Sequence, residues 1–217
     1  MEINGYMRET LILWIKEMGI VFLCAIMGVA ALVVTYFISN DCMREHVWES
    51  AIILHSEGLG AYLWQDVEET KLDIYTDGLM INVSYTETED GVRDILLGTH
   101  VEVDGRNPMD SLYEVAVLAN DNYTVKNYGR YWHGYQVLLR PLLCFFNYSD
   151  ILQINMILQL LLVFGFVTLL AGTEERVYIV PFLGMYVFLC PVSLAGSLQY
   201  SPCFYIMMST LTALFIW

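Results

Sequence analysis

The chain has few basic residues, because 10 lysines and arginines stand against 24 aspartates and glutamates, for a net charge of −14. Proteins bind nucleic acid largely through Lys and Arg contacts to phosphates, so the lack of a sizeable basic surface argues against a nucleic-acid partner. The five cysteines include no CxxC pair and no His/Cys spacing typical of zinc, so we predict no metal site of that kind. Only Cys42 and Cys144 lie outside long apolar stretches, and their positions permit a disulfide.

Charge of either sign is missing from four long stretches. The mean hydropathy of +0.51 and the 57% of hydrophobic residues exceed what an ordinary soluble domain carries. About 20 apolar residues cross the ~30 Å hydrocarbon layer of a bilayer, so each stretch is a candidate transmembrane helix. The stretches are 19–39, 151–173, 177–198 and 201–217, and we expect the last to be truncated. The sequence predicts a mostly α-helical integral membrane protein with three to four transmembrane helices.

The first stretch also has an interpretation as a cleaved signal peptide. It is longer than a typical signal core, and no small-x-small cleavage site precedes the acidic segment that follows. Both observations favour a transmembrane helix that is retained.

Basic residues near these stretches predict an orientation. Arg8 and Lys16 precede the first stretch, and Arg176 lies between the second and the third. Lys and Arg favour the cytoplasmic side, which places residues 1–18 inside the cell and residues 40–150 outside. This external loop holds 19 of the 24 acidic residues. We expect a multi-pass protein of a bacterial plasma membrane with a cytoplasmic N-terminus.

The large loop has the pattern of a small mixed α/β cap. Helical periodicity in Met43–Leu59 predicts an amphipathic helix that lies on the membrane. Alternating apolar and polar residues predict short strands at 81–86 and 99–104. Ser111 and Glu114 have the spacing of a capping box, which predicts the start of a further helix.

Three carboxylates of the loop are candidates for chemistry. Asp73 and Asp77 are spaced by one helical turn, and Glu49 is the third acid. Two such carboxylates can share a divalent cation, or one can act as a general base whose pKa is raised by the other. The alternative is that they are solvated charges in a loop where acids are common. Asp77 is preferred because it stands among apolar residues in TDGLMIN.

The segment Arg130–Ile151 (RYWHGYQVLLRPLLCFFNYSDI) carries a second candidate site. On a helix, four of its residues fall within one arc of about 120°: Arg130, His133, Gln136 and Arg140. Such a stripe on an interfacial helix suits the phosphate of a lipid-linked ligand, because one guanidinium group can bind two phosphate oxygens in a bidentate contact. The alternative is a plain membrane anchor in contact with lipid headgroups. With the helix near residue 43, this segment would bracket the loop between two amphipathic juxtamembrane helices.

Two strings in this chain, LDIYTDGLMIN and YGRYWHGYQVLLRPLLCFFNYSDI, resemble those of a group of uncharacterised bacterial multi-pass membrane proteins, over most of Glu49–Val163. The order of the segments also resembles the N-terminal part of GT-C-type glycosyltransferases. One span comes first, then a large external loop with amphipathic ends, and then closely spaced spans. In those enzymes an acid of the first external loop is the catalytic base, and basic residues near the interface hold a polyprenyl-phosphate sugar. This sequence departs from their pattern directly after the first span, where Asp41 is followed by Cys42 rather than by a second acid.

The resemblance implies a membrane glycosyltransferase of the cell envelope, which transfers a sugar from a polyprenyl-phosphate-type donor to an external acceptor. The implied catalytic base is Asp77, followed in preference by Glu49 and then Asp73. The implied substrate-binding residues are Arg130, His133 and Arg140. A divalent cation is the one cofactor that the acidic pair suggests. The alternative is a non-enzymatic membrane component, for lipid-linked glycan transport or assembly, with membrane lipids and other membrane subunits as partners.

Overall fold

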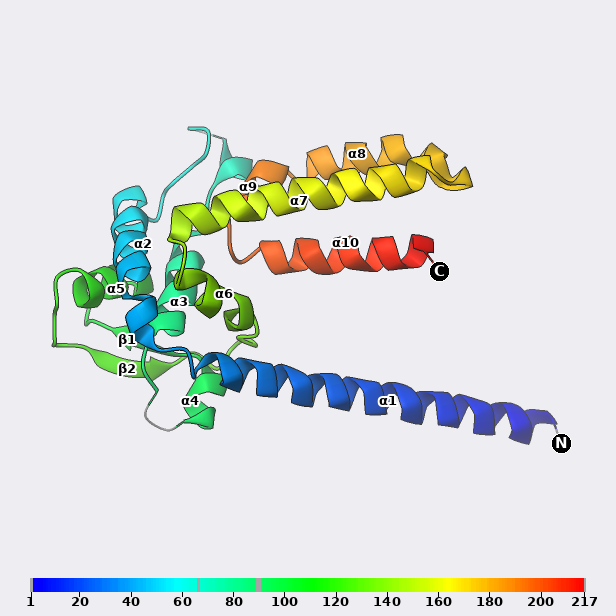
Figure 1. Ribbon diagram of the computed structural model, residues 1–217, viewed down its shortest axis with the longest axis horizontal. Helices are drawn as coiled ribbons and strands as arrows, with labels where there is room; N and C mark the ends of the chain where they lie inside the picture. Colours follow the sequence, from blue (N-terminus) through cyan, green and yellow to red (C-terminus); the bar gives the residue numbers. More distant parts are fainter. Residues whose placement is uncertain (1, 66, 89–90, 217) are drawn as a thin grey trace.

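The computed structural model describes residues 2–65, 67–88 and 91–216, without the side chains of residues 2–6 and 69. Figure 1 shows a cap of short helices and one small sheet, from which the helices α1, α7, α8 and α10 all extend to the same side. The prediction of a mostly helical chain with a mixed α/β cap is confirmed.

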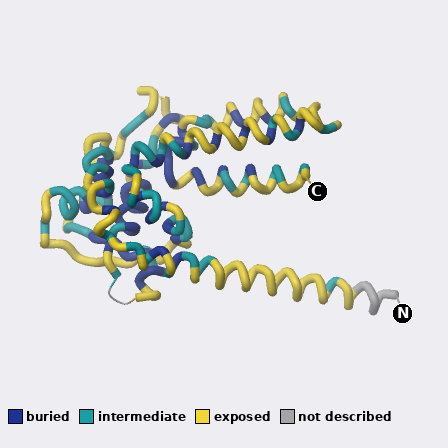
Figure 2. The backbone as a smooth tube through the Cα atoms, in the orientation of Figure 1, coloured by how far each residue is buried: buried dark blue, intermediate teal, exposed yellow. Residues whose placement is uncertain are grey.

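Two helices are long and apolar enough to cross a membrane. They are α1 (Glu2–Thr35) and α7 (Tyr148–Ala171), and the apolar part of α1 begins at Met7. Only 11% of the most apolar window of α1 is buried, and Figure 2 shows that helix exposed along most of its length. The surface of α1 therefore lacks the contacts that would bury it inside a soluble core.

The predicted third span is not one helix. Residues 177–198 form the end of the 3₁₀ turn η3 (Glu174–Tyr178), then α8 (Ile179–Phe188) and α9 (Pro191–Ala195). At 1.5 Å per residue the 10 residues of α8 extend about 15 Å, half of a hydrocarbon layer. The predicted fourth span is α10 (Ser201–Ile216), with 16 residues. Packed aromatic side chains, including Phe166, join α7, α8 and α10 into one group.

Within the part of the chain that the structure describes, the cap contains five α-helices, the first turn of a sixth and a two-stranded sheet. The helices are α2 (Arg44–Glu57), α3 (Ile74–Tyr85), α4 (Val92–Leu97), α5 (Pro108–Ala116), α6 (Gln136–Leu143) and the first turn of α7. The strands β1 (Thr99–Glu102) and β2 (Thr124–Asn127) pair antiparallel, and the 3₁₀ turns are η1 (Asn40–Cys42) and η2 (Glu68–Thr70). The core side chains come from most of these elements: Met43, Val47, Leu54, Ile74, Ile81, Leu112, Leu143 and Tyr148.

Three local predictions need correction. The segment 81–86 is not a strand but the end of α3, whose residues 77–84 are buried on every side, so its polar and apolar residues show no helical stripe. Helix α5 begins at Pro108 rather than near Ser111, because Asn107 accepts a hydrogen bond from the backbone N–H of Asp110. The helix predicted at Met43–Leu59 is present as α2, but its apolar face packs against α3, α5 and α7 rather than on a membrane.

The predicted basic stripe is also wrong, because its four residues do not lie on one helix. Helix α6 begins at Gln136, so Arg130 and His133 lie in the loop before it, and Arg140 points into the cap with 2% of its surface exposed. Cys42 and Cys144 form a disulfide, which joins the end of η1 to the end of α6. The two ends of the cap are therefore held together.

Candidate functional site

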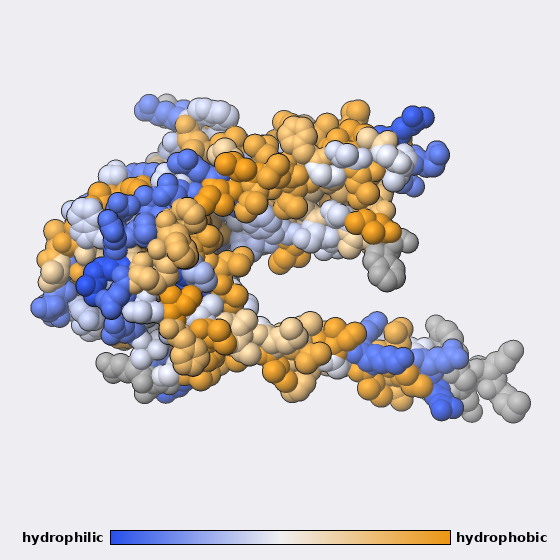
Figure 3. All heavy atoms as spheres, in the orientation of Figure 1, coloured by the Kyte–Doolittle hydropathy of each residue, from blue (hydrophilic) through white to orange (hydrophobic). Residues whose placement is uncertain are grey.

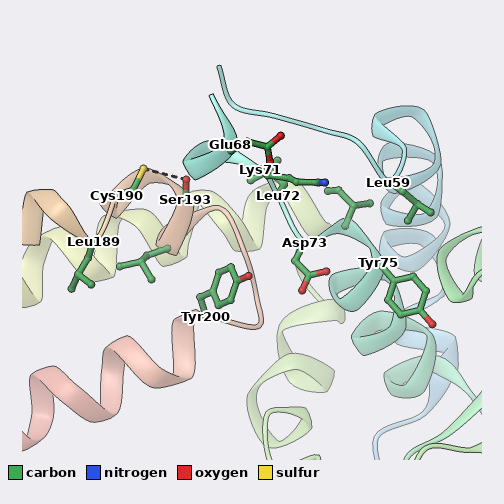
Figure 4. Close-up of a pocket in the computed structure, with 12 residues that line it drawn as sticks. Leu59, Glu68, Lys71, Leu72, Asp73, Tyr75, Leu189, Cys190, Ser193 and Tyr200 are labelled. Atoms are coloured by element: carbon green, nitrogen blue, oxygen red, sulfur yellow. Dashed lines mark hydrogen bonds between the residues drawn. The ribbon is translucent and has the colours of Figure 1, made fainter. Parts of the chain in front are cut away.

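A cleft of about 510 Å³ lies where the cap meets the break between α8 and α9 (Figure 4). One wall is the segment from the end of α2 to the start of α3, and the other comes from residues 189–200. Seven of the twelve lining residues carry polar or charged groups: Glu68, Lys71, Asp73, Tyr75, Cys190, Ser193 and Tyr200. The other five are four leucines and one isoleucine, so the cleft combines apolar side chains with convergent polar groups, as ligand sites do.

Asp73 is the one predicted catalytic residue that lines this cleft. It is the N-cap of α3, and its Oδ1 accepts a hydrogen bond of 3.1 Å from the backbone N–H of Thr76. Its Oδ2 accepts no hydrogen bond from the residues that the structure describes. Figure 4 shows Asp73 and Tyr200 entering the cleft from opposite walls. The carboxylate is thus fixed through one oxygen and has the other available for a ligand.

A cation stands at the rim of the same cleft. The Nζ of Lys71 lies 5.7 Å from the ring centroid of Tyr62, and the hydroxyl of Tyr62 donates to Glu68 at 3.0 Å. Lys71 makes no ion pair with the described residues, and its side chain is exposed. Its ammonium group can therefore contact an anionic group that enters the cleft.

Cys190, in the opposite wall of the cleft, has a strained backbone conformation. Its φ of 49° lies in the left-handed region, which is uncommon for a residue other than glycine. Its Sγ lies 3.2 Å from the hydroxyl of Ser193, one turn into α9. Strained residues gather at binding and catalytic sites, so this observation favours the cleft as a functional site.

Asp77, the preferred base, is fully buried one turn further along α3. Its two oxygens accept four hydrogen bonds, from the Tyr148 and Ser197 hydroxyls and from the backbone N–H groups of Leu198 and Gln199, at 2.9–3.3 Å. Burial raises the pKa of Asp77 to about 7. Asp77 therefore joins α3 to α7 and to the segment between α9 and α10, which continues into Tyr200 of the cleft. It positions a wall rather than facing the cleft.

Glu49, the other predicted acid, lies outside the cleft. Its carboxylate accepts a hydrogen bond of 2.8 Å from the side chain of Asn147, and Asn147 caps the start of α7. The structure therefore gives Glu49 a role in holding α2 against α7.

The guanidinium group of Arg140 donates most of its hydrogen bonds to backbone carbonyl groups. Its Nε donates to Thr35 at 3.1 Å, its Nη2 donates to Ile38 at 3.0 Å and to the Asn40 side chain at 3.1 Å, and its Nη1 donates to Ser84. Thr35 and Ser84 lie in the last turns of α1 and α3, where the helix dipole favours a cation, and Ile38 and Asn40 follow α1. Arg140 thus fastens α1 to the cap, and most of its donors are unavailable to a phosphate.

Neither His133 nor Arg130 lines the cleft. The Nε2 of His133 donates to the backbone carbonyl of Tyr128 at 2.7 Å, and burial lowers the pKa of this imidazole. His133 is therefore neutral near pH 7. Arg130 is exposed, with its guanidinium 5.2 Å from the ring centroid of Tyr131. The structure does not bring the three predicted substrate-binding residues to Asp73.

Among the described residues, no group of three or more His, Cys, Asp or Glu side chains could hold a metal ion. The predicted sharing of a cation by Asp73 and Asp77 is not the arrangement seen, because Asp77 uses both oxygens on protein donors. No protein-family model, curated protein or solved structure matches the chain.

Sequence reasoning missed Lys71, Cys190 and Tyr200. Lys71 is the only lysine between Lys16 and Lys126, and its place two residues before Asp73 is a signal that could have been used. Cys190 and Tyr200 lie more than 110 residues away and carry no pattern, so only the fold brings them to Asp73.

Proposed function

We propose that this chain is a membrane glycosyltransferase-like protein whose catalytic cleft lies between the cap and the helices that extend from it. The observation that carries the proposal is Asp73: a carboxylate held at a helix N-terminus with one oxygen open to a cleft, opposite a strained wall. Lys71 at the rim supplies a cation for a phosphate.

The proposal includes a position in the membrane, with the cap outside the cell. Arg8 and Arg176 both lie at the ends of helices remote from the cap, in α1 and in η3 (Figure 1). This distribution fits the preference of basic residues for the cytoplasmic side. The disulfide between Cys42 and Cys144 supports an oxidising compartment for the cap. On this proposal α1 and α7 cross the membrane, and α8–α10 form a further membrane-embedded part.

In the proposed reaction, the Oδ2 atom of Asp73 takes the proton from an acceptor hydroxyl. The acceptor oxygen then forms a bond to the anomeric carbon of the donor sugar, and the bond from that carbon to the phosphate oxygen breaks. The lipid phosphate leaves with the bonding electrons, and the ammonium of Lys71 stabilises its negative charge. A cleft beside the membrane helices suits this donor, because the lipid chain remains in the hydrocarbon layer while the phosphate reaches the cleft.

The test is the Asp73→Asn variant in membranes that contain the full-length protein. Asn caps a helix about as well as Asp, so α3 should keep its N-cap while the base is lost. We expect sugar transfer from a polyprenyl-phosphate sugar to fall by about 10²- to 10⁴-fold, the usual contribution of a general base. Asp121→Asn, in an exposed loop, is the matched control and should retain activity. Transfer at the wild-type rate by Asp73→Asn would contradict the proposal.

The alternative is a non-enzymatic membrane component, and the open surface of α1 favours it. Figure 3 shows empty space between α1 and the group of α7, α8 and α10, with apolar residues along α1. Further membrane helices of a partner subunit would fit beside such a surface. This alternative predicts that Asp73→Asn leaves the biological function unchanged, whereas polar substitutions on the exposed face of α1, such as Phe22→Ser, abolish co-purification of a partner.

A further inference from the structure

The loop between β2 and α6 is held in a fixed shape at both ends. At its start, the backbone N–H of Tyr128 donates to the carbonyl of Leu97, at the end of α4, at 2.9 Å. At its other end, His133 donates back to the carbonyl of Tyr128 at 2.7 Å. His133 also packs against Gly98, where an added Cβ would overlap the imidazole. The residues between these fixed points, 129–132, are therefore presented on a rigid base.

This loop exposes two large aromatic side chains and one cation. Tyr131 is 57% exposed and Trp132 is 54% exposed, and the guanidinium of Arg130 lies over the ring of Tyr131. Trp, Tyr and Arg together are typical of the layer where lipid headgroups meet hydrocarbon.

The loop also reaches along α1 beyond the base of the cap. A Cβ added to Gly28 would lie 3.5 Å from Cζ2 of Trp132, so the indole ring lies against α1 at this level. Gly28 is seven residues before Thr35, the last residue of α1. At 1.5 Å per residue this places Trp132 about 10 Å from the cap end of the helix, within the depth of a headgroup layer.

Helix α4 extends the same surface around α1. It packs against α1, and its first residue, Val92, is 50% exposed beside the exposed Arg93. We call the exposed side chains of Val92, Arg93, Arg130, Tyr131 and Trp132 the collar. Within an acidic cap, the collar thus presents two cations and three large apolar side chains on α4 and on the loop before α6, both of which contact α1.

We propose that the collar docks on the bilayer, with Trp132 and Tyr131 in the headgroup layer and Arg130 and Arg93 against lipid phosphates. A lipid surface, rather than a protein, is the occupant because the collar continues directly into the exposed apolar surface of α1. The collar would fix the height and tilt of the cap over the membrane. This inference rests on membrane insertion of α1 and is independent of sugar transfer, which takes place at a different part of the cap.

Fluorescence quenching by brominated lipids tests the depth of Trp132. The chain has five tryptophans, so full-length variants with single tryptophans at positions 14, 48, 64 and 132 are made by Trp→Phe substitution of the others. They are reconstituted into vesicles that contain phosphatidylglycerol and a phosphatidylcholine brominated near the headgroup end of its chains. Trp48 is an exposed residue of α2 in the cap and serves as the matched control, Trp14 in α1 reports insertion, and Trp64 reports the depth of the segment beside α9.

We expect brominated lipid to reduce the emission of Trp14 and Trp132 while leaving Trp48 unchanged, and iodide in the water to quench Trp48 but neither Trp14 nor Trp132. Quenching of Trp132 by iodide and not by brominated lipid would overturn the proposal. If neither reagent quenched Trp132, a protein surface would cover the collar, and the proposal would also be wrong. Asp73→Asn should leave all four results unchanged, which separates this inference from the proposed reaction.

Discussion

Raising the pH should destabilise the fold through Asp77. The pKa of its carboxyl is about 7 in the folded chain and 3.8 as an ordinary value, because burial disfavours the charged form. Between these pH values the folded state holds a proton that the unfolded state has released. The stabilisation is therefore complete below about pH 4 and is lost as the pH rises through 7.

The size of the effect follows from the difference in pKa. About three pKa units at about 1.4 kcal/mol per unit give a loss on the order of 4 kcal/mol in the free energy of unfolding. For a chain of this length, 1 kcal/mol moves Tm by about 2–4 °C, so the total is on the order of 10 °C. Most of the loss falls between pH 5 and pH 7.

The assay is thermal unfolding in detergent micelles from pH 5 to pH 8, with Asp77→Asn as the control. Other carboxylates titrate in both proteins, so the quantity of interest is the difference between the two Tm profiles. Tyr148→Phe provides a second comparison, because it removes a donor to Oδ2 of Asp77 and should move the midpoint of the profile to higher pH. A difference that stays constant with pH would refute the reasoning.

Three further predictions concern the groups that hold the cap together. Arg140→Ala should reduce the free energy of unfolding by about 3–5 kcal/mol in denaturant titrations, since it leaves buried carbonyl groups unpaired, and Lys at that position should not restore it. Cys42→Ser, which breaks the bond to Cys144, should cost about 2–5 kcal/mol in the same assay, and a reducing agent should then have no further effect. Gly98→Ala should destabilise by more than 1 kcal/mol, because φ is 65° there and the added methyl group meets His133, whereas Gly105→Ala has strain without the overlap and should cost less.

Sequence patterns predicted the parts of the fold that depend on local composition. The apolar run of α7 is long enough to be recognised alone, and the alternation at 99–104 correctly predicted a strand, although residues 99–101 of β1 are all buried. The strand predicted at 81–86, which is the end of α3, was wrong for a physical reason. Ile81 and Val83 alternate with Asn82 and Ser84 in the sequence, but all four are buried in a helix packed on every side, and Asn82 is satisfied by the backbone of Val101.

The candidate site was predicted only in part for a similar reason. The acidic pair Asp73 and Asp77 was found from its spacing, yet which of the two faces a cleft depends on the segment after α9, more than 100 residues later. Arg140 shows the opposite case. Its residue type suggested a phosphate contact, but the carbonyl groups that occupy it come from the ends of two helices, which no sequence pattern brings together.

The fastening of α1 by Arg140 has a consequence for how the chain is made. Thr35 and Arg140 are 105 positions apart, so at about 5–20 residues per second roughly 5–20 s separate their synthesis. During that interval α1 is already synthesised, while Arg140 and Cys144, which bind its end and Cys42, are not yet made. Synthesis of the first helix and closure of the cap are therefore separate events in time. A ribosome that pauses before residue 140 would lengthen the period in which Cys42 can form the wrong disulfide.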